Sequence, residues 1–269
     1  MTSISNNDLL SLGDLNLAEF NREFARWNER YEIIESDDLL MTLGADAFPG
    51  ANFVMRLAPA CTPSANELLD RAMAFFQARQ RGFSIHVRRH IDTDLEAACE
   101  AAGMFKVGNS AGMCLDTPLP DKPEDGSVQV RVIEERQGAV DFADVTVASY
   151  KSLGLPEETG KKMFAAPERM LKPHIVPVVA YDHGVPVSVA MALMSHGIAG
   201  IYWVGTVETH RRRGLAERCT RIAGNRAFAM GATRVVLQAS HMGEPVYQGM
   251  GYREFTRYPW YMWFYKKRG

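Results

Sequence analysis

The stretch with the clearest chemical potential is GTVETHRRRGLAERC, from Gly205 to Cys219. It passes from an apolar, strand-like segment through a basic turn into a sequence with helical spacing. The first backbone N–H groups of a helix have no partner within the helix, and the helix dipole favours negative charge there. Gly214 allows a ligand to approach the backbone closely. The stretch therefore predicts a binding site for a diphosphate group.

A second stretch, EPVYQGMGY, places the phenol of Tyr247 on a short predicted helix that ends at Gly251. A phenol can protonate a departing thiolate, but it can equally be a core aromatic group whose hydroxyl is satisfied. Arg218 and Arg221 fall on the polar side of the preceding helix, where a solvated charged face is the simpler interpretation. Three histidines in predicted turns are more typical of solvated groups than of catalytic ones: His196, His210 and His241.

The elements that position these residues form the second half of the chain, residues 128–269. Periodicity predicts strands over 128–133, 176–181, 185–194, 198–204 and 235–237, and helices over 140–152, 156–164, 215–230 and 244–250. Asp182, His183 and Gly184 form a hairpin-type turn between two of the strands. The best-defined helix closes at Gly231, and its expected buried face consists of Leu215, Cys219, Ile222, Ala223, Ala227 and Met230.

The first half of the chain, residues 1–120, repeats part of this order. It is expected to contain strands over 52–57 and 83–87 and helices over 65–79 and 94–102. Its sequence of helix, glycine, strand FSIHV, helix and Gly103 parallels helix, glycine, strand RVVLQ, helix and Gly251. The segment TPLPDKPEDGS contains the expected linker, residues 121–127. The sequence therefore predicts two copies of one fold.

The second half resembles the GNAT N-acetyltransferase superfamily. Its coenzyme A motif is Arg or Gln, two variable residues, Gly, one variable residue, then Gly or Ala, and Arg211, Gly214 and Ala216 fill these places. Tyr247, before Gly251 and Tyr252, resembles the C-terminal motif of the same family. The resemblance implies an α/β (α+β) fold with two GNAT-like domains, each a mixed, mostly antiparallel sheet flanked by helices.

The resemblance also implies a reaction. Acetyl-coenzyme A is expected as co-substrate, with no metal, and its acetyl group would pass directly to a small acceptor, a primary amine, with Tyr247 as general acid. The general base stays open among Glu208, a water held by Gln238 and Ser240, and other groups. The region 150–164 lies where the family builds its acceptor lid. The implied coenzyme-binding residues are Trp203, Val204, Gly205, Thr206 and Val207 on the strand, and Arg211, Arg212, Arg213, Gly214, Leu215 and Ala216 at the turn.

The first half lacks both motifs. Its strand ANFVMRLAP leads into ACTPSANELL, which has no Arg or Gln with the required Gly, and Cys99 stands where Tyr247 would be. We therefore expect a degenerate copy that supports the second one. Two other interpretations stay open: a noncatalytic coenzyme-binding or protein-interaction module, and nucleic-acid binding through the arginines and the aromatic tail. That tail, RYPWYMWFYKKRG, is interpreted instead as a packed edge strand, with Pro259 at an edge or bulge.

The bulk composition limits the partners. The 269 residues carry a formal net charge of -2, which provides no field to draw the chain onto nucleic acid or an anionic membrane. The start MTSISNNDLL does not resemble a secretory signal, and no apolar run is long enough to span a membrane. A cytoplasmic protein with a small-molecule acceptor is expected, and a homodimer is left open. Four cysteines without CxxC pairing are expected to be reduced and buried: Cys61, Cys99, Cys114 and Cys219.

Overall fold

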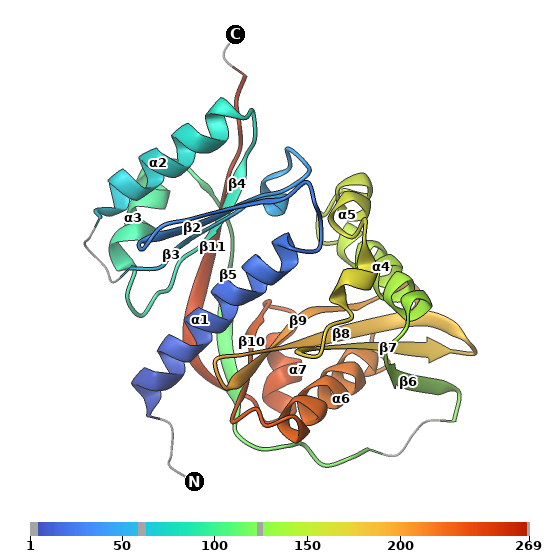
Figure 1. Cartoon of the computed structure of the whole chain (residues 1–269). Coiled ribbons are helices and arrows are strands. Elements are labelled where there is room, and N and C mark those ends of the chain that lie inside the picture. Colours follow the sequence, from blue (N-terminus) through green and yellow to red (C-terminus); the bar gives the residue numbers. More distant parts are fainter. Residues whose placement is uncertain (1–4, 59–62, 123–125, 268–269) are drawn as a thin grey trace.

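The computed structural model describes residues 5–58, 63–122 and 126–267. Its centre is an eleven-stranded sheet (Figure 1). The strands are β1 (Glu32–Glu35), β2 (Leu39–Leu43), β3 (Phe53–Arg56), β4 (Phe83–His86), β5 (Phe105–Leu115), β6 (Val128–Val132), β7 (Ile175–Asp182), β8 (Val185–Ser195), β9 (Ile198–Thr206), β10 (Val235–Ala239) and β11 (Arg253–Trp263). Their order across the sheet is β1-β2-β3-β4-β11-β5-β10-β9-β8-β7-β6. The neighbours β3–β4 and β9–β10 are parallel and the other described pairs antiparallel, which confirms the predicted mixed sheet.

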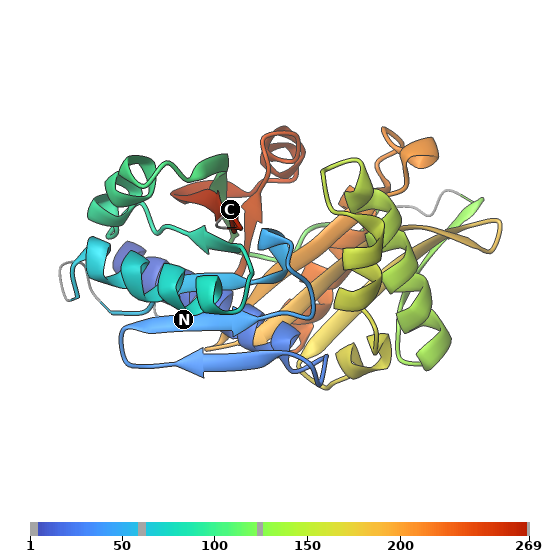
Figure 2. The ribbon, with the colours of Figure 1, turned by 90° about the horizontal axis from the view of Figure 1, so that it is seen from above.

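Helices cover both faces of this sheet, and the buried clusters show which helix packs where. One face packs against α1 (Asn6–Ala25), α4 (Arg136–Lys151) and α5 (Glu157–Met163), which share one apolar cluster with the strands. The opposite face packs against α2 (Ala65–Ala78) and α3 (Thr93–Ala101) in the first half, and α6 (Leu215–Ala229) and α7 (Glu244–Gly249) in the second. Three short 3-10 helices, η1 (Pro49–Ala51), η2 (Pro167–Met170) and η3 (Glu208–His210), complete the described elements. Seen from above, first-half elements and helices α4 and α5 lie at opposite ends of the molecule (Figure 2).

The two halves exchange their last strands. β5 ends the first half but pairs with β10 of the second, and β11 ends the second half but pairs with β4 of the first. β5 and β11 also pair with each other, so the sheet is continuous (Figure 1). The predicted edge position of the aromatic tail is therefore wrong, because β11 lies at the centre of the sheet. Each half completes the sheet of the other.

Pro259 occupies an interior strand without breaking it. Its carbonyl accepts the N–H of Val87 at 2.9 Å, and the register between β5 and β11 shifts just after it, between Trp260 and Tyr261. A proline cannot donate to the sheet ladder, so an irregularity beside it is expected, and this part of the prediction is confirmed. Two aromatic side chains of the tail, Tyr258 and Tyr261, are fully buried, which fits a central strand, whereas Phe264 beyond the strand is exposed.

Most predicted elements form close to their expected bounds, and the hairpin turn illustrates why. His183 and Gly184 both have positive φ, 48° and 82°, which is the geometry of a two-residue turn between twisted strands. Helix α1 and strands β1 and β2 were not predicted. A local signal for α1 existed, because Ser5 and Asp8 form a capping box at its start. None of the described helices is both long and apolar enough to cross a membrane.

The buried face of α6 is mostly as predicted, with two corrections. Leu215, Cys219, Ala223 and Ala227 are buried, and Ile222 is partly buried. Met230 is exposed, because it caps the end of the helix beyond the sheet. The predicted thiols Cys99, Cys114 and Cys219 are free and buried, whereas Cys61 lies outside the described residues, as do residues 123–125 of the predicted linker.

Candidate active site

Strands β9 and β10 run together only at their start and then separate. Their ladder ends at the pair Ile201–Leu237, whereas β9 stays paired with β8 as far as Thr206. The β8–β9 register shifts between Val189 and Met191, where β9 carries an extra residue and Trp203 has φ 52°. This is a β-bulge, which bends the strand and re-aims its side chains. The later backbone of β9 therefore faces the gap left by β10.

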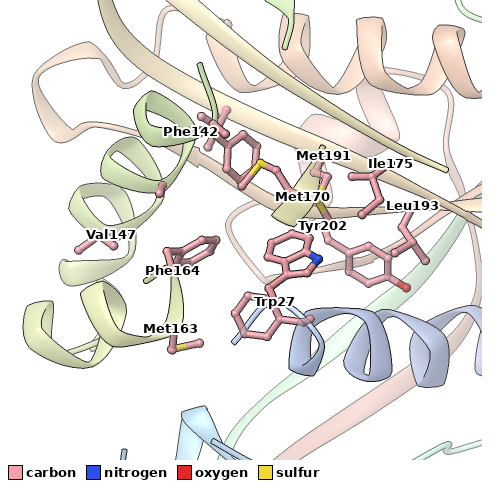
Figure 3. Packing of buried hydrophobic residues seen from close by; sticks show 14 of the residues in the cluster. Trp27, Phe142, Val147, Met163, Phe164, Met170, Ile175, Met191, Leu193 and Tyr202 are labelled. Carbon is pink, nitrogen blue, oxygen red and sulfur yellow. The ribbon is translucent and has the colours of Figure 1, made fainter. Parts of the chain in front are cut away.

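The bulge also turns two successive side chains toward the same helices. The Tyr202 ring stacks on Phe20 of α1 at 3.8 Å, and the Trp203 ring lies 5.2 Å from that of Phe24, also in α1. Trp203 further contacts Phe164 at 5.2 Å and Tyr150 at 5.3 Å. Trp27, Phe164 and Tyr202 lie in this apolar layer between α1, the α5 region and the strands (Figure 3). The first half of the chain thus contributes part of the wall beside β9.

The turn after β9 presents a row of free backbone donors. Arg212 and Gly214 both have positive φ, 64° and 73°, and Gly214 is the N-cap of α6. The first hydrogen bond of the helix joins the N–H of Arg218 to the carbonyl of Gly214 at 3.1 Å. Within the described residues, the N–H groups of 212–217 donate to no other protein group. A Cβ added at Gly214 would meet open space. This arrangement fits an anion at a helix N-terminus.

The three arginines of the turn have separate roles. The Arg211 guanidinium donates to the carbonyls of Ser149 at 3.2 Å and Thr206 at 3.3 Å and to the Ser152 hydroxyl at 2.5 Å, so it ties the turn to the end of α4. Arg213 pairs with Asp182 in the hairpin turn at 2.7 Å. This hydrogen bond, foremost, holds the pKa of Asp182 below its usual range. Arg212 alone has an exposed side chain without a partner among the described residues.

Arg218 and Arg221 are not the solvated face that the sequence suggested. Arg218 donates to the carbonyl of Val128 at 3.1 Å. Arg221 is buried and donates to the carbonyl of Pro120 at 2.7 Å and to Glu217 at 2.7 Å. These oxygens satisfy its two terminal nitrogens, whereas its Nε has no partner among the described residues. Both side chains therefore fasten α6 to the residues that precede and begin the second half.

Tyr247 lies on α7 and is largely buried against α6 and the sheet. Its ring packs edge-on against that of Tyr252, 5.7 Å away, and both belong to the apolar cluster of Leu215. Burial raises the pKa of Tyr247 to about 12, with a smaller opposing effect from Thr220, so the phenol is protonated at neutral pH. Burial, and next the neighbouring Tyr247, raise the pKa of Tyr150, whose hydroxyl donates to the carbonyl of Val204 at 3.2 Å. The Tyr150 hydroxyl thus contacts the bulged part of β9, and Tyr247 packs with Leu215 at the start of α6.

The groups considered for the general base differ in their surroundings. Glu208 is exposed on η3, and Ser240 is exposed with its hydroxyl accepting the N–H of Gly243 at 3.2 Å. Gln238 is half-buried, and its Nε2 has no partner among the described residues. Among the turn histidines, His196 and His241 are exposed, whereas His210 lies within 3.4 Å of Asp182. No described group of three or more His, Cys, Asp and Glu side chains is placed to hold a metal.

The corresponding separation in the first half, at the ends of β3 and β4, is crossed by ion pairs. Arg56 is fully buried and donates to Asp94 at 2.8 Å. Arg88 donates to the fully buried Asp92 at 2.7 Å and to the carbonyl of Ala58 at 2.8 Å. Sequence analysis missed this network, because an arginine at the end of a strand ordinarily indicates a solvent-exposed edge. Residues 59–62, part of the turn without a coenzyme motif, lie outside the described residues.

Cys99 occupies the place of Tyr247 in this first copy. It is fully buried, and its surroundings raise the pKa of its thiol to about 12, mainly through burial. A buried thiol of this kind is inert. In the described part of the first copy, the Ser64 hydroxyl caps the start of α2 by accepting the N–H of Glu67 at 3.3 Å, and the position of Cys99 offers no available acid.

No protein-family model matches the chain, and no curated protein matches it. Solved structures do match over most of its length. A GCN5-related N-acetyltransferase from Kribbella flavida is similar with a TM-score of 0.70 and 19% identity, over 93% of this chain and 94% of that one. One from Sphaerobacter thermophilus has a TM-score of 0.62 at 15% identity, over 86% and 82%. A tandem GNAT protein from the clavulanic acid biosynthesis pathway has a TM-score of 0.61 at 10% identity, over 100% and 98%.

These likenesses establish the fold: the chain has the fold of GNAT acetyltransferases, with two copies in tandem. The prediction of a tandem GNAT fold is therefore confirmed. Within it, the second copy has the open separation of β9 and β10 and the free turn at Gly214, and the first copy has the ion pairs of Arg56 and Arg88.

Proposed function

We propose that the chain is an acyltransferase that binds acetyl-coenzyme A in its second half and passes the acetyl group directly to a small primary amine. The observation that carries the proposal is the row of free N–H groups at residues 212–217, beside the separated end of β9. Such a row suits a diphosphate, and the unpaired strand edge suits an extended amide-containing arm. Acetyl-coenzyme A has both parts and supplies a reactive thioester.

The residues of this site would act on the reaction in defined ways. The backbone at Trp203–Thr206 would orient the thioester, and the Tyr247 phenol would face the sulfur from α7. The amine nitrogen attacks the thioester carbonyl, the C–S bond breaks, and the departing thiolate takes the phenol proton. Because burial keeps Tyr247 protonated at neutral pH, it can serve as this proton source. The amine loses its own proton to a base that stays open among water and nearby groups.

Calorimetry with acetyl-coenzyme A tests the binding half of the proposal. Gly214→Glu places a carboxylate, in a strained left-handed conformation, where the diphosphate would lie. We expect its Kd to rise at least about ten-fold, which corresponds to about 1.4 kcal/mol. Gly231→Glu is the matched control, because Gly231 also has positive φ and open space but lies at the other end of α6. Equal Kd values for wild type and Gly214→Glu would contradict the proposal.

Thiol release from acetyl-coenzyme A in the presence of amine libraries tests the chemical half. Turnover with at least one amine supports the acyltransferase, provided that no thiol is released without acceptor. Tight coenzyme binding without turnover for any amine would instead favour the noncatalytic coenzyme-binding module. This pair of experiments separates the fold's ability to bind from its ability to react.

A further inference from the structure

Four buried polar atoms on one face of the sheet have no hydrogen-bond partner in the described part of the chain. They are His86 Nδ1, Trp203 Nε1, Gln238 Nε2 and Trp260 Nε1. Buried polar groups are almost always hydrogen-bonded, so each such atom calls for an explanation. His86 lies on β4 and Trp260 on the exchanged strand β11, whereas Trp203 lies on β9 and Gln238 on β10.

All four side chains lie on the face that carries α1. The Tyr258 hydroxyl donates to Asp14 of α1, so Trp260, two residues further along β11, points to the same side. His86 is the cross-strand partner of Trp260, and the two rings stack at 5.5 Å. Val236 packs with Leu9 of α1, which gives Gln238 the same orientation. Trp203 packs against α1 directly.

The floor between these groups is a glycine. Gly108 on β5 is the cross-strand partner of Trp260, and a Cβ added to it would meet no atom within 4 Å. The pairing of β10 with β5 ends at Ala239–Ala111, so Gly108 lies beyond the end of β10, in the direction in which β9 and β10 separate. Open space therefore lies over β5 next to the place where the thioester is proposed to sit. The four unpartnered atoms are themselves covered by protein, so a ligand over Gly108 would reach an indole N–H only after that side chain rotates.

The chemistry of these groups is neutral and aromatic. Burial lowers the pKa of His86 to about 4, so its imidazole is uncharged at neutral pH. Its ring lies between those of Phe53, at 5.3 Å, and Trp260, at 5.5 Å. The buried acids that α1 contributes to this face are already engaged: Glu23 by Trp27 at 2.9 Å and Lys172 at 2.5 Å, and Asp14 by Tyr258 at 2.9 Å and His90 at 3.0 Å. A flat ring with a hydrogen-bond-accepting oxygen matches such surroundings better than a polyamine, which needs free carboxylates.

We infer that the first half of the chain completes the acceptor site, and that the acceptor is an aromatic primary amine bearing an uncharged oxygen. Its ring would lie over Gly108 against His86 and Trp260, its oxygen would accept an indole N–H, and its amine would point toward the separation of β9 and β10. This inference rests on the proposed function. It assigns the degenerate copy a part in choosing the acceptor.

Acceptor preference tests the chemical class. Thiol release from acetyl-coenzyme A would be measured with tyramine, phenethylamine and spermidine. We expect kcat/KM for tyramine to exceed that for spermidine at least about ten-fold, and that for phenethylamine to fall between them because it lacks the oxygen. A preference for spermidine would overturn the inference while leaving the proposed acyl transfer intact. A wild type that binds no acetyl-coenzyme A, or turns over no amine, would overturn both.

Two variants test the location. Gly108→Leu fills the floor and should raise the KM for tyramine at least about ten-fold with the Kd for acetyl-coenzyme A unchanged. Asn109→Leu is the matched control, because it places the same side chain one residue further along β5, on the opposite face, and should leave KM within about two-fold. Trp260→Phe keeps a ring but loses the N–H, and should reduce the preference for tyramine over phenethylamine. An unchanged KM for tyramine in Gly108→Leu would place the acceptor elsewhere. If Gly108→Leu does not fold, an unchanged preference for tyramine in Trp260→Phe would lead to the same conclusion.

Discussion

In both copies of the fold, a pair of parallel strands separates at corresponding places. The two separations differ in what lies between the strands. Beyond Ile201, the edge of β9 that faces β10 has no strand partner and lies beside the free N–H groups at the start of α6. Between β3 and β4 two buried arginines bind Asp92 and Asp94. The same backbone can thus leave an open gap or form a structural core, depending on whether charged side chains occupy the space between the strands. The strand exchange joins the two outcomes in one sheet.

The largest expected effect contrasts Tyr247 with Cys99, its counterpart in the first copy. Tyr247→Phe removes the proposed proton donor and keeps the ring, so kcat should fall by about 10² to 10⁴, the usual range for loss of general acid catalysis. The Kd for acetyl-coenzyme A should change little. Cys99→Ala should leave kcat unchanged, although the lost packing lowers stability. Single-turnover kinetics with saturating coenzyme measures both, and a kcat for Tyr247→Phe within about three-fold of wild type would remove Tyr247 from the mechanism.

The next effect concerns stability in the first copy. Arg56→Ala leaves the fully buried Asp92 and the partly buried Asp94 without their shared partner. Arg88 still pairs with Asp92 in this variant, and Asp94 is partly exposed, so the cost should fall below about 3 to 5 kcal/mol, the value typical of a broken buried ion pair. We expect about 1.5 to 3 kcal/mol, the usual worth of a hydrogen bond to a charged group. Urea unfolding monitored by fluorescence would report the loss. Arg212→Ala, an exposed arginine of the second copy, is the control and should cost less than about 0.5 kcal/mol. A loss of unfolding free energy as small as that of the control would mean that the ion pairs of Arg56 do not stabilise the separation of β3 and β4.

The motifs were predictable because local chemistry fixes them. Gly214 and Gly251 adopt positive φ at the predicted start of one helix and the predicted end of another. Tyr247 lies on the short helix that was predicted to end at Gly251. The strand exchange could not be predicted, since β5 and β11 show the same alternation whichever neighbour they pair with. The pairing is decided by contacts between segments more than a hundred residues apart, such as Arg257 with the carbonyl of Asn109.

Long-range partners also explain the errors in the site. Arg221 reads as a solvated residue on the polar side of α6, but its partner is the carbonyl of Pro120, far away in sequence. Arg56 lies in a predicted strand, but its partner Asp94 comes from helix α3. Helical and strand periodicity describe which way a side chain points from its own element. They contain no information on which other segment covers it.

A smaller effect follows from the acid limb of the stability curve. Hydrogen bonding to Arg56, foremost, lowers the pKa of Asp94 below its ordinary 3.8 in the folded chain. The folded state therefore holds its proton less tightly than the unfolded state, so this contribution is fully present above about pH 4 and is lost as pH falls through the folded pKa. Arg56→Ala should make unfolding less sensitive to pH in this acid range. Parallel acid limbs for wild type and variant, from urea midpoints below pH 5, would argue against the link.

The smallest effect separates the arginine of the coenzyme motif from direct contact with the coenzyme. Arg211 holds the turn through Ser149, Ser152 and Thr206, so Arg211→Ala should loosen the free N–H groups without removing a phosphate ligand. Loss of one or two such bonds is worth about 0.5 to 1.5 kcal/mol, which corresponds to a rise in Kd of about two- to twelve-fold. Because the guanidinium would not meet the diphosphate, the salt dependence of coenzyme binding should stay as in wild type. A weaker salt dependence of the Kd in Arg211→Ala, measured by calorimetry at increasing ionic strength, would instead show that Arg211 turns to the coenzyme when it binds. The second copy would then differ from the first in having an arginine that moves on binding.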